Sequence, residues 1–229
     1  MCPKQFYEIV PPHVDAHALA GHLFVIEGSD GSGRSTQISL LTNWLEHDGF
    51  PVVNVGLKRS TLISKQLNEA QQSKAIGPIT LQLFYATDFM DQLENAIIPA
   101  LRAGFIVLAD RYIYTLMARA IVRKADPAWV KSVYGIAIVP DAVFYLMVKP
   151  QILIERNFQK KATLDYWESG MDIGYSTDMF QSFFAYQRQI QKQFLRMKDE
   201  YGFQLINGNR SIRTIFRDLQ GRIQQLLPR

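Results

Sequence analysis

The stretch EGSDGSGRST, residues 27–36, narrows the choice of fold for this 229-residue chain more than any other part of the sequence. An apolar run at residues 23–27 leads into it, and an amphipathic stretch follows, in which Ile38, Leu41 and Leu45 fall on one helical face. A glycine-rich loop between a buried strand and a helix can close its backbone N–H groups around phosphate oxygens. The sequence therefore predicts a phosphate-binding loop at this point.

The loop follows the pattern Gly, four residues, Gly, Lys, then Ser or Thr, except that Arg34 replaces the lysine. Arginine stays cationic and binds phosphate through two hydrogen bonds, but its planar fork is wider than an ammonium group. We expect the replacement to lower the catalytic rate more than it weakens phosphate binding. The alternative is that the site is inactive and the lysine was lost by drift. Ser35 offers the hydroxyl with which such loops ligate Mg²⁺. The residues expected at the nucleotide phosphates are Gly28, Ser29, Asp30, Gly31, Ser32, Gly33, Arg34, Ser35 and Thr36.

Strand and helix patterns alternate along the rest of the chain. Buried strands are predicted at residues 23–27, 51–55, 105–110, 142–148 and 203–207. Helices are predicted at residues 61–73, 80–102, 112–123, 127–139, 178–201 and 211–227. This alternation indicates an α/β fold with a parallel sheet between helices. We expect one domain at residues 23–229, after an N-terminal extension at residues 1–22 that Phe6, Tyr7 and Ile9 partly order.

Charge and composition exclude several classes of protein. The net charge of +4 is spread along the chain, so a small anionic ligand explains it as well as nucleic acid does, and we expect no nucleic-acid partner. The single cysteine, Cys2, rules out an internal disulfide framework and favours a reducing, cytoplasmic setting. No apolar run approaches the ~20 residues of a membrane span, so we expect no membrane association.

From about residue 23 to residue 227, the chain resembles the thymidylate kinases, a family of P-loop nucleotide kinases. The resemblance depends on the order and spacing of six segments: IEGSDGSGRSTQ, RSTLISKQLN, LQLFYATDF, IIPALRAGFIVLADRYIYT, VPDAVFYLMVKP and LIERNFQKK. It implies a P-loop NTPase-type parallel five-stranded sheet flanked by helices, with a lid at roughly residues 150–177. The implied reaction converts ATP and dTMP into ADP and dTDP with Mg²⁺.

The resemblance assigns two acceptor-binding residues near the loop. Asp30 matches the loop carboxylate that faces the deoxyribose of the acceptor, although an aspartate there could equally cap the following helix. Arg59, in the segment KRST, matches the arginine that holds the acceptor phosphate, and the same segment reads as a plain helix N-cap.

Two more candidates lie where the predicted strand at residues 105–110 ends, at the sheet edge where ligands bind in open α/β folds. The resemblance makes Arg111 a clamp on the acceptor phosphate and a catalytic residue. It places Asp110 near Mg²⁺, together with Ser35. An isolated Asp-Arg pair would more often be a salt bridge.

The base pocket matches the family less well. Phe84 corresponds to the aromatic residue that stacks on the acceptor base, although a phenylalanine on such a helix is usually a core residue. Four residues later, the family has an arginine that donates to thymine, whereas this chain has Asp88, which can only accept. Arg119 replaces an aromatic pocket residue. The lost and gained charges suggest a pair between Asp88 and Arg119 in the acceptor site.

The expected lid carries cations at helical spacing. Arg156, Lys160 and Lys161 can share one helix face that points at the phosphates, and Arg156 is the expected catalytic cation. A solvated basic face would give the same pattern. With the loop and the clamp, the expected catalytic residues are therefore Arg34, Arg111 and Arg156.

Three functions remain open from the sequence. The first is a kinase that phosphorylates dTMP with ATP and Mg²⁺, and the second is the same fold with another nucleotide or nucleoside as acceptor. The third is a nucleotide-binding protein without turnover, although such a protein has no need of an acceptor-phosphate clamp. The expected partners are small nucleotides, and apolar residues in the helix at residues 80–102 would suit a homodimer.

Overall fold

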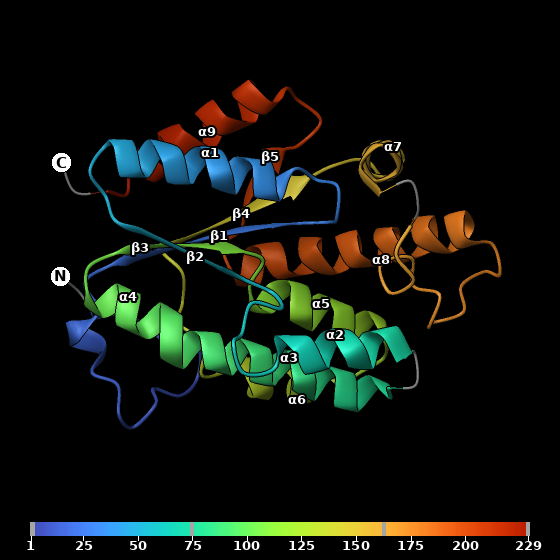
Figure 1. The fold of residues 1–229 in the computed structure, drawn as a ribbon, viewed down its shortest axis with the longest axis horizontal. Helices are drawn as coiled ribbons and strands as arrows, with labels where there is room; N and C mark the ends of the chain where they lie inside the picture. Colours follow the sequence, from blue (N-terminus) through green and yellow to red (C-terminus); the bar gives the residue numbers. More distant parts are fainter. Residues whose placement is uncertain (1–2, 74–75, 162–163, 228–229) are drawn as a thin grey trace.

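The computed structural model describes residues 3–73, 76–161 and 164–227, and these form a five-stranded sheet with helices on both faces (Figure 1). All strand pairs are parallel, in the order β2-β3-β1-β4-β5. The strands are β1 (His22–Gly28), β2 (Val52–Gly56), β3 (Ile106–Asp110), β4 (Ala142–Met147) and β5 (Gln204–Asn207). The predicted α/β fold with a parallel five-stranded sheet is confirmed.

Successive residues of β1 point to opposite faces of the sheet, and this alternation produces two cores. Leu23 and Val25 belong to one core, whereas Phe24 and Ile26 belong to the other. The second core is covered by α1 (Arg34–His47) and α9 (Ile212–Gln224), which lie together above the sheet in Figure 1. The helices of the opposite layer are α2 (Ser64–Ser73), α3 (Pro78–Gln92), α4 (Ile98–Arg102), α5 (Ile113–Val122), α6 (Pro127–Tyr134) and α8 (Met179–Glu200).

The strand register brings the carboxyl ends of β1, β2, β3 and β4 close to one level. Ile26 pairs with Asp110, Gly56 also pairs with Asp110, and Gly28 pairs with Leu146. Loops that leave these ends therefore meet at one edge of the sheet. The helix α7 (Pro150–Lys161), which follows β4, lies beyond the same edge (Figure 1).

Two predicted helices differ from the structure. The segment predicted as one helix over residues 80–102 consists of α3, a π-helical turn η2 (Leu93–Ile97) and α4. Pro99, in the first turn of α4, has no N–H to donate to an α-helical hydrogen bond. This fits the change from α-helical to π-helical hydrogen bonding just before it. The helix predicted at residues 127–139 ends at Tyr134, because the next residues pair with the N-terminal segment.

The N-terminal segment packs against the domain. Phe6 forms an antiparallel bridge with Ile138, and the hydroxyls of Tyr7 and Tyr114 are 2.5 Å apart. The side chain of Ile9, in contrast, is 60% exposed, and Ile9 contributes through its N–H, which donates to Gly135 O at 3.2 Å. A short 3₁₀ turn, η1 (Ala16–Ala18), precedes β1. None of the helices in the described part of the chain combines the length and hydrophobicity of a membrane-spanning segment.

Candidate functional site

The predicted phosphate loop connects β1 to α1, and glycine makes its path possible. Gly31 and Gly33 have φ angles of 80° and 96°, which residues with a Cβ rarely adopt. Gly33 is also the N-cap of α1, so the first N–H groups of the helix face the loop. A cavity of about 550 Å³ lies against the loop. Its lining includes Asp30, Ser35, Thr36, Arg156, Asn157 and Arg210.

Arg34 lies inside the loop, and only 6% of its surface is exposed. Its Nη1 donates to the carbonyl oxygens of Gly28 and Ser29, the latter at 2.6 Å, and its Nε donates to Asp110 Oδ1 at 2.7 Å. Burial disfavours the charged guanidinium, but Asp110 and Asp30 outweigh it and raise the pKa of Arg34. The cation is therefore held where the phosphates are expected.

Ser35 and Asp110 supply hard oxygen atoms at one point. Ser35 Oγ donates to Asp110 Oδ2 at 3.0 Å. Burial opposes ionisation of Asp110, but Arg34 and Arg111 hold its pKa below the ordinary value. The described residues contain no group of three or more His, Cys, Asp or Glu side chains that could hold a metal. One carboxylate and one hydroxyl nevertheless fit Mg²⁺, which usually keeps waters and substrate phosphates as its other ligands.

Asp30 is the centre of a cluster of arginines. Arg111 Nη2 forms an ion pair with its Oδ1, Arg34 Nη2 lies 3.3 Å from the same oxygen, and Arg119 Nη2 lies 3.3 Å from Oδ2. Burial opposes ionisation, but Arg111, Glu168, Arg34 and Arg119 hold the pKa of Asp30 well below its usual range. Asp30 does not cap α1, whose N-cap is Gly33 without a side-chain hydrogen bond; it joins the loop to two residues of the expected acceptor side.

Glu168 joins this cluster from the segment that follows α7. Its Oε1 lies 3.8 Å from Arg119 Nη2, and it shares a hydrogen bond with Asp30. Burial, followed by the charge and hydrogen bond of Asp30, raises the pKa of Glu168 to about 8. At neutral pH the pair is therefore one carboxylate and one protonated carboxyl group.

Arg111 follows β3 in a backbone conformation that is unusual for an arginine. Its φ angle is 72°, and its N–H donates to Ile26 O at 3.0 Å. Glu27, fully buried at the end of β1, accepts from the N–H groups of Tyr112 and Thr115 and so fixes the start of α5. The Arg111 Nε is buried without a hydrogen-bond partner. A strained backbone and an unused donor are features of ligand-binding positions.

Arg59 lies near the Oδ2 atom of Asp110, and its side chain is 44% exposed. Its Nη2 is 3.9 Å from Asp110 Oδ2, and its Nη1 donates to Val55 O at 3.4 Å. Arg34, Arg59 and Arg111 thus surround Asp110 from three chain segments. The structure brings together these predicted phosphate-binding residues.

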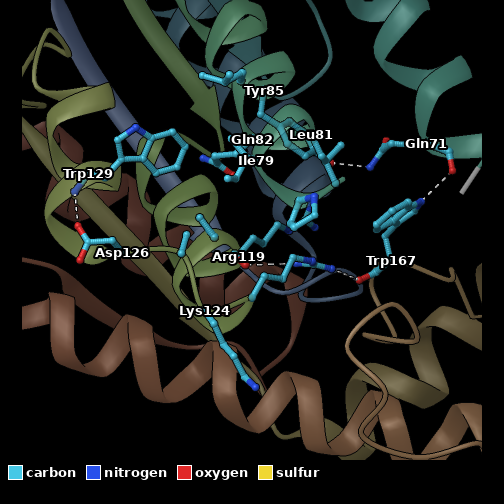
Figure 2. A pocket seen from close by; sticks show the side chains of 15 residues that line it. Gln71, Ile79, Leu81, Gln82, Tyr85, Arg119, Lys124, Asp126, Trp129 and Trp167 are labelled. Atoms are coloured by element: carbon cyan, nitrogen blue, oxygen red, sulfur yellow. Dashed lines mark hydrogen bonds between the residues drawn. The ribbon is translucent and has the colours of Figure 1, made fainter. Parts of the chain in front are cut away.

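A second, larger cavity of about 630 Å³ opens beyond Arg119 (Figure 2). Tyr85 lines it and is 5% exposed, and its hydroxyl accepts from Gln71 Nε2 at 2.8 Å. Phe84, the predicted stacking residue, is not part of this lining but packs half-buried against the core. Of these two neighbours on α3, Tyr85 faces the cavity and Phe84 does not.

Asp88 is fully buried and has its own partners. Its carboxylate accepts from Lys58 N at 2.8 Å, Ser60 N at 3.0 Å and Gln92 Nε2 at 3.1 Å. Burial raises the pKa of Asp88. No ion pair joins Asp88 and Arg119 among the described residues, and the predicted pair is wrong: Arg119 pairs with Asp30 instead. A base contact by Asp88 stays a prediction, and its hydrogen bonds favour a role in holding residues 58–60.

If Tyr85 is the stacking aromatic, the position four residues later is Phe89. Phe89 is 4% exposed and contacts Tyr112 and Tyr134 edge-on, at centroid distances of 5.2 and 5.8 Å. Phe89 is therefore a core residue, and Asp88 keeps the sequence position at which the family has an arginine that donates to thymine. Among the described residues, three cations line the cavity: Arg119, Arg123 and Lys124.

Of the expected lid cations, Arg156 reaches the loop. Its Nη1 donates to Ser32 O at 3.3 Å and its Nη2 to Gly208 O at 3.2 Å. The side chains of Lys160 and Lys161 lie outside the part of the chain that the structure describes. Asn157, next to Arg156, donates from Nδ2 to Asp30 O at 3.1 Å. The helix α7 is thus tied to the phosphate loop by two neighbouring residues.

Two residues of the site escaped the sequence reasoning. Tyr85 is the neighbour of a predicted residue in the same motif, so attention to helix facing would have found it. Glu168 lies in YWESG, more than 130 residues from Asp30, and no spacing signal connects the two. Their contact depends on how the segment after α7 returns to the sheet edge.

Comparison with known proteins gives a consistent result. The family model described as "Thymidylate kinase" matches residues 26–219. A protein of Saccharolobus solfataricus named "Probable thymidylate kinase 2" is 37% identical over 203 residues, which cover 88% of this chain and 95% of that protein. A "Thymidylate kinase" of Fervidobacterium nodosum is 30% identical, covering 84% and 93% of the two chains. A "Probable thymidylate kinase" of Thermococcus kodakarensis is 26% identical, covering 89% and 97%.

Proposed function

Because the chain belongs to the thymidylate kinase family, we propose that it transfers the γ-phosphoryl group of ATP to dTMP and releases ADP and dTDP. The bond between the γ-phosphorus and the bridging oxygen breaks, and a bond to an oxygen of the dTMP phosphate forms. The enzyme's task is to align two anionic phosphates and stabilise their charge.

One observation supports this proposal most directly: the two cavities meet at a single charged cluster. Asp30 lines the 550 Å³ cavity beside the loop, and it also lines a small hollow of about 20 Å³ together with Arg111 and Arg119. Arg119 in turn lines the 630 Å³ cavity. A donor nucleotide in the first cavity and an acceptor in the second would therefore meet at Arg34, Arg111 and Asp30.

The residues around this junction have complementary tasks in the proposed reaction. Arg111, with its free Nε, and Arg59, with its exposed guanidinium, would hold the acceptor phosphate. Arg34 and Arg156 would stabilise the charge on the transferred group. The Asp30 carboxylate keeps Arg111 and Arg119 in place and would accept from a sugar hydroxyl of the acceptor.

We also infer that Ser35 and Asp110 hold Mg²⁺ when ATP is bound, as their oxygen atoms and close approach allow. The ion would neutralise negative charge on the β- and γ-phosphates. We further propose a cytoplasmic homodimer. The support for a contact between copies is the number of apolar residues in the helical segment at residues 80–102. Light scattering on the purified protein would give its mass.

The test of the function is a coupled ADP-release assay with dTMP, dUMP, dCMP, dGMP and dAMP. We expect the highest kcat/KM with dTMP, and we expect Arg111→Ala to lower it by ~10²-fold or more with a large rise in KM for dTMP. Arg196→Ala, which removes an exposed arginine on α8, is the matched control. ADP release that does not depend on any acceptor would contradict a monophosphate kinase.

A second candidate is a kinase of the same mechanism with a different nucleotide as acceptor. It is favoured by Asp88 at the sequence position of the thymine-binding arginine and by Arg119 at the cavity. In the same panel, rejection of dTMP with turnover of dGMP or dCMP would select this alternative.

A further inference from the structure

The 630 Å³ cavity is bounded on one side by residues 165–173, which we call the return segment because it leads from α7 back to α8. Trp167 is its contribution to the wall, and in Figure 2 it faces the cavity from the side opposite Trp129. Other wall residues are Gln71 on α2, Tyr85 and Gln82 on α3, and Arg119 on α5. The cavity size is within the range of small-molecule sites.

The indole of Trp167 is fixed to the opposite wall. Its Nε1 donates to the backbone oxygen of Gln71 at 3.0 Å, while the Gln71 side chain donates to the Tyr85 hydroxyl at 2.8 Å. Figure 2 shows Gln71 between the two aromatic residues, with a hydrogen bond to each. One residue of α2 therefore sets the positions of two aromatic rings on the cavity wall.

Arg123, at the C-terminal end of α5, holds the return segment by hydrogen bonds and an ion pair. It binds both carboxylate oxygens of Asp172, at 2.7 and 3.0 Å, and donates to the backbone oxygen of Trp167 at 3.0 Å. Its guanidinium carbon lies 5.1 Å from the ring centroid of Tyr186 and 6.0 Å from that of Trp167. A planar fork that binds in this way cannot be replaced by a lysine without loss.

The return segment is also fastened to α8. Ser182 Oγ donates to Ser169 O at 2.8 Å, and Gln187 Nε2 donates to Glu168 O at 3.1 Å. Gly170, with a φ angle of 63°, passes so close to Tyr186 that an added Cβ would lie 2.8 Å from its Cβ. The segment is therefore a built part of the cavity wall and reaches from Trp167 to the Asp30 cluster through Glu168.

We propose that Trp167 is a specificity-determining residue that packs its indole against the acceptor base beside Tyr85, and that Arg123 is the residue that positions it. The proposal rests on the proposed function, because it takes the cavity as the site of the acceptor base. Aromatic rings stack on any nucleobase. Stacking on these rings would raise the affinity for a base of fitting shape. Selection among bases would depend on hydrogen bonds with neighbouring polar groups such as Gln71 and Arg119.

The experiment is a titration of intrinsic tryptophan fluorescence with dTMP in the absence of ATP, combined with steady-state kinetics. We expect Trp167→Ala to raise the Kd and KM for dTMP by ~10-fold, as for loss of a stacked ring, with the KM for ATP unchanged. Trp167→Phe should restore most of the affinity, and it also serves if the alanine variant fails to fold. Trp44→Phe, on the remote helix α1, should behave like wild type in affinity and turnover.

Arg123→Lys separates positioning from direct binding. We expect a raised KM for dTMP with kcat within about threefold of wild type, and a red-shifted Trp167 emission because the indole loses its fixed, half-buried place. A normal emission spectrum with an unchanged KM would overturn the positioning role of Arg123.

The remaining outcomes distinguish a failure of the proposed role of Trp167 from a failure of the proposed kinase function. Unchanged dTMP affinity in Trp167→Ala, in a wild-type background that phosphorylates dTMP, overturns the role of Trp167 alone. Binding of dTMP that depends on Trp167, without any phosphoryl transfer, supports the proposed role of Trp167 and overturns the kinase function. A wild-type protein that binds no nucleoside monophosphate overturns both.

Discussion

The guanidinium of Arg34 donates to the carboxylate of Asp110, with 2.7 Å between Nε and Oδ1. This bond joins the phosphate loop to the end of β3. The same carboxylate accepts from Ser35, so the loop cation and the candidate Mg²⁺ ligands belong to one network. An arginine at this position is therefore built into the site rather than left at its edge.

Replacement of Arg34 by alanine is expected to lower turnover of ATP and acceptor by ~10²-fold or more, because a cation near the transferred phosphate is lost. Arg34→Lys should retain or raise activity, since lysine keeps the charge in a more compact group. Coupled ADP release, with thermal unfolding of each variant to check folding, measures both effects. Wild-type turnover in a folded Arg34→Ala protein would show that this cation is not catalytic.

Arg156→Ala is expected to lower kcat more than it raises the KM for ATP. Arg156 bridges Ser32 O and Gly208 O beside the nucleotide cavity, so it can shift to the transferred group as charge develops. Saturation kinetics with ATP separate the two constants, with Arg196→Ala as control. A changed KM at constant kcat would assign Arg156 to ground-state binding.

Asp88→Ala is expected to destabilise the protein, because the N–H groups of Lys58 and Ser60 lose a buried acceptor, at about 1–3 kcal/mol for each unsatisfied group. Asp88→Asn keeps an acceptor oxygen and should cost less. Asp88→Arg should lower stability without improving dTMP turnover. Urea unfolding gives the stabilities, and a folded Asp88→Arg protein with improved dTMP turnover would instead support a base contact.

The pH dependence of stability should contain a contribution from Glu168. Its pKa is raised to about 8 in the folded protein, against about 4.3 in an unfolded chain, so the folded state holds a proton that the unfolded state releases. This contribution is complete below pH ~4.3 and is lost as pH rises through about 8. The charged groups that act on Glu168 include Asp30, Arg111, Arg119 and Lys58.

Glu168→Gln is the corresponding test, because glutamine stays neutral and can still donate to Asp30. We expect the variant to gain stability relative to wild type between pH 6 and 8.5 and to differ little near pH 4.5. Asp30 has a lowered pKa, so its own contribution is lost only in stronger acid and leaves this window unchanged. Parallel stability curves for the two proteins across this range would argue against a protonated Glu168.

Local sequence determined the frame of the site. The strand before the loop, the glycines at positions 31 and 33, and Asp110 with Arg111 after β3 could be identified from hydrophobic runs and turn chemistry, which act over short stretches. The family resemblance placed Asp110 near Mg²⁺ together with Ser35, and the structure joins the two side chains by a hydrogen bond.

The tertiary structure alone decided the partners. The family resemblance predicts Phe84 as the stacking residue, whereas the structure places its neighbour Tyr85 on the cavity wall. A carboxylate has no preference in sequence for one arginine over another, and Arg119 pairs with Asp30 while backbone N–H groups occupy Asp88. Likewise, Glu168 and Trp167 reach the site only because α8 and Arg123 hold the return segment against it. Such contacts depend on how whole elements pack, which no local pattern encodes.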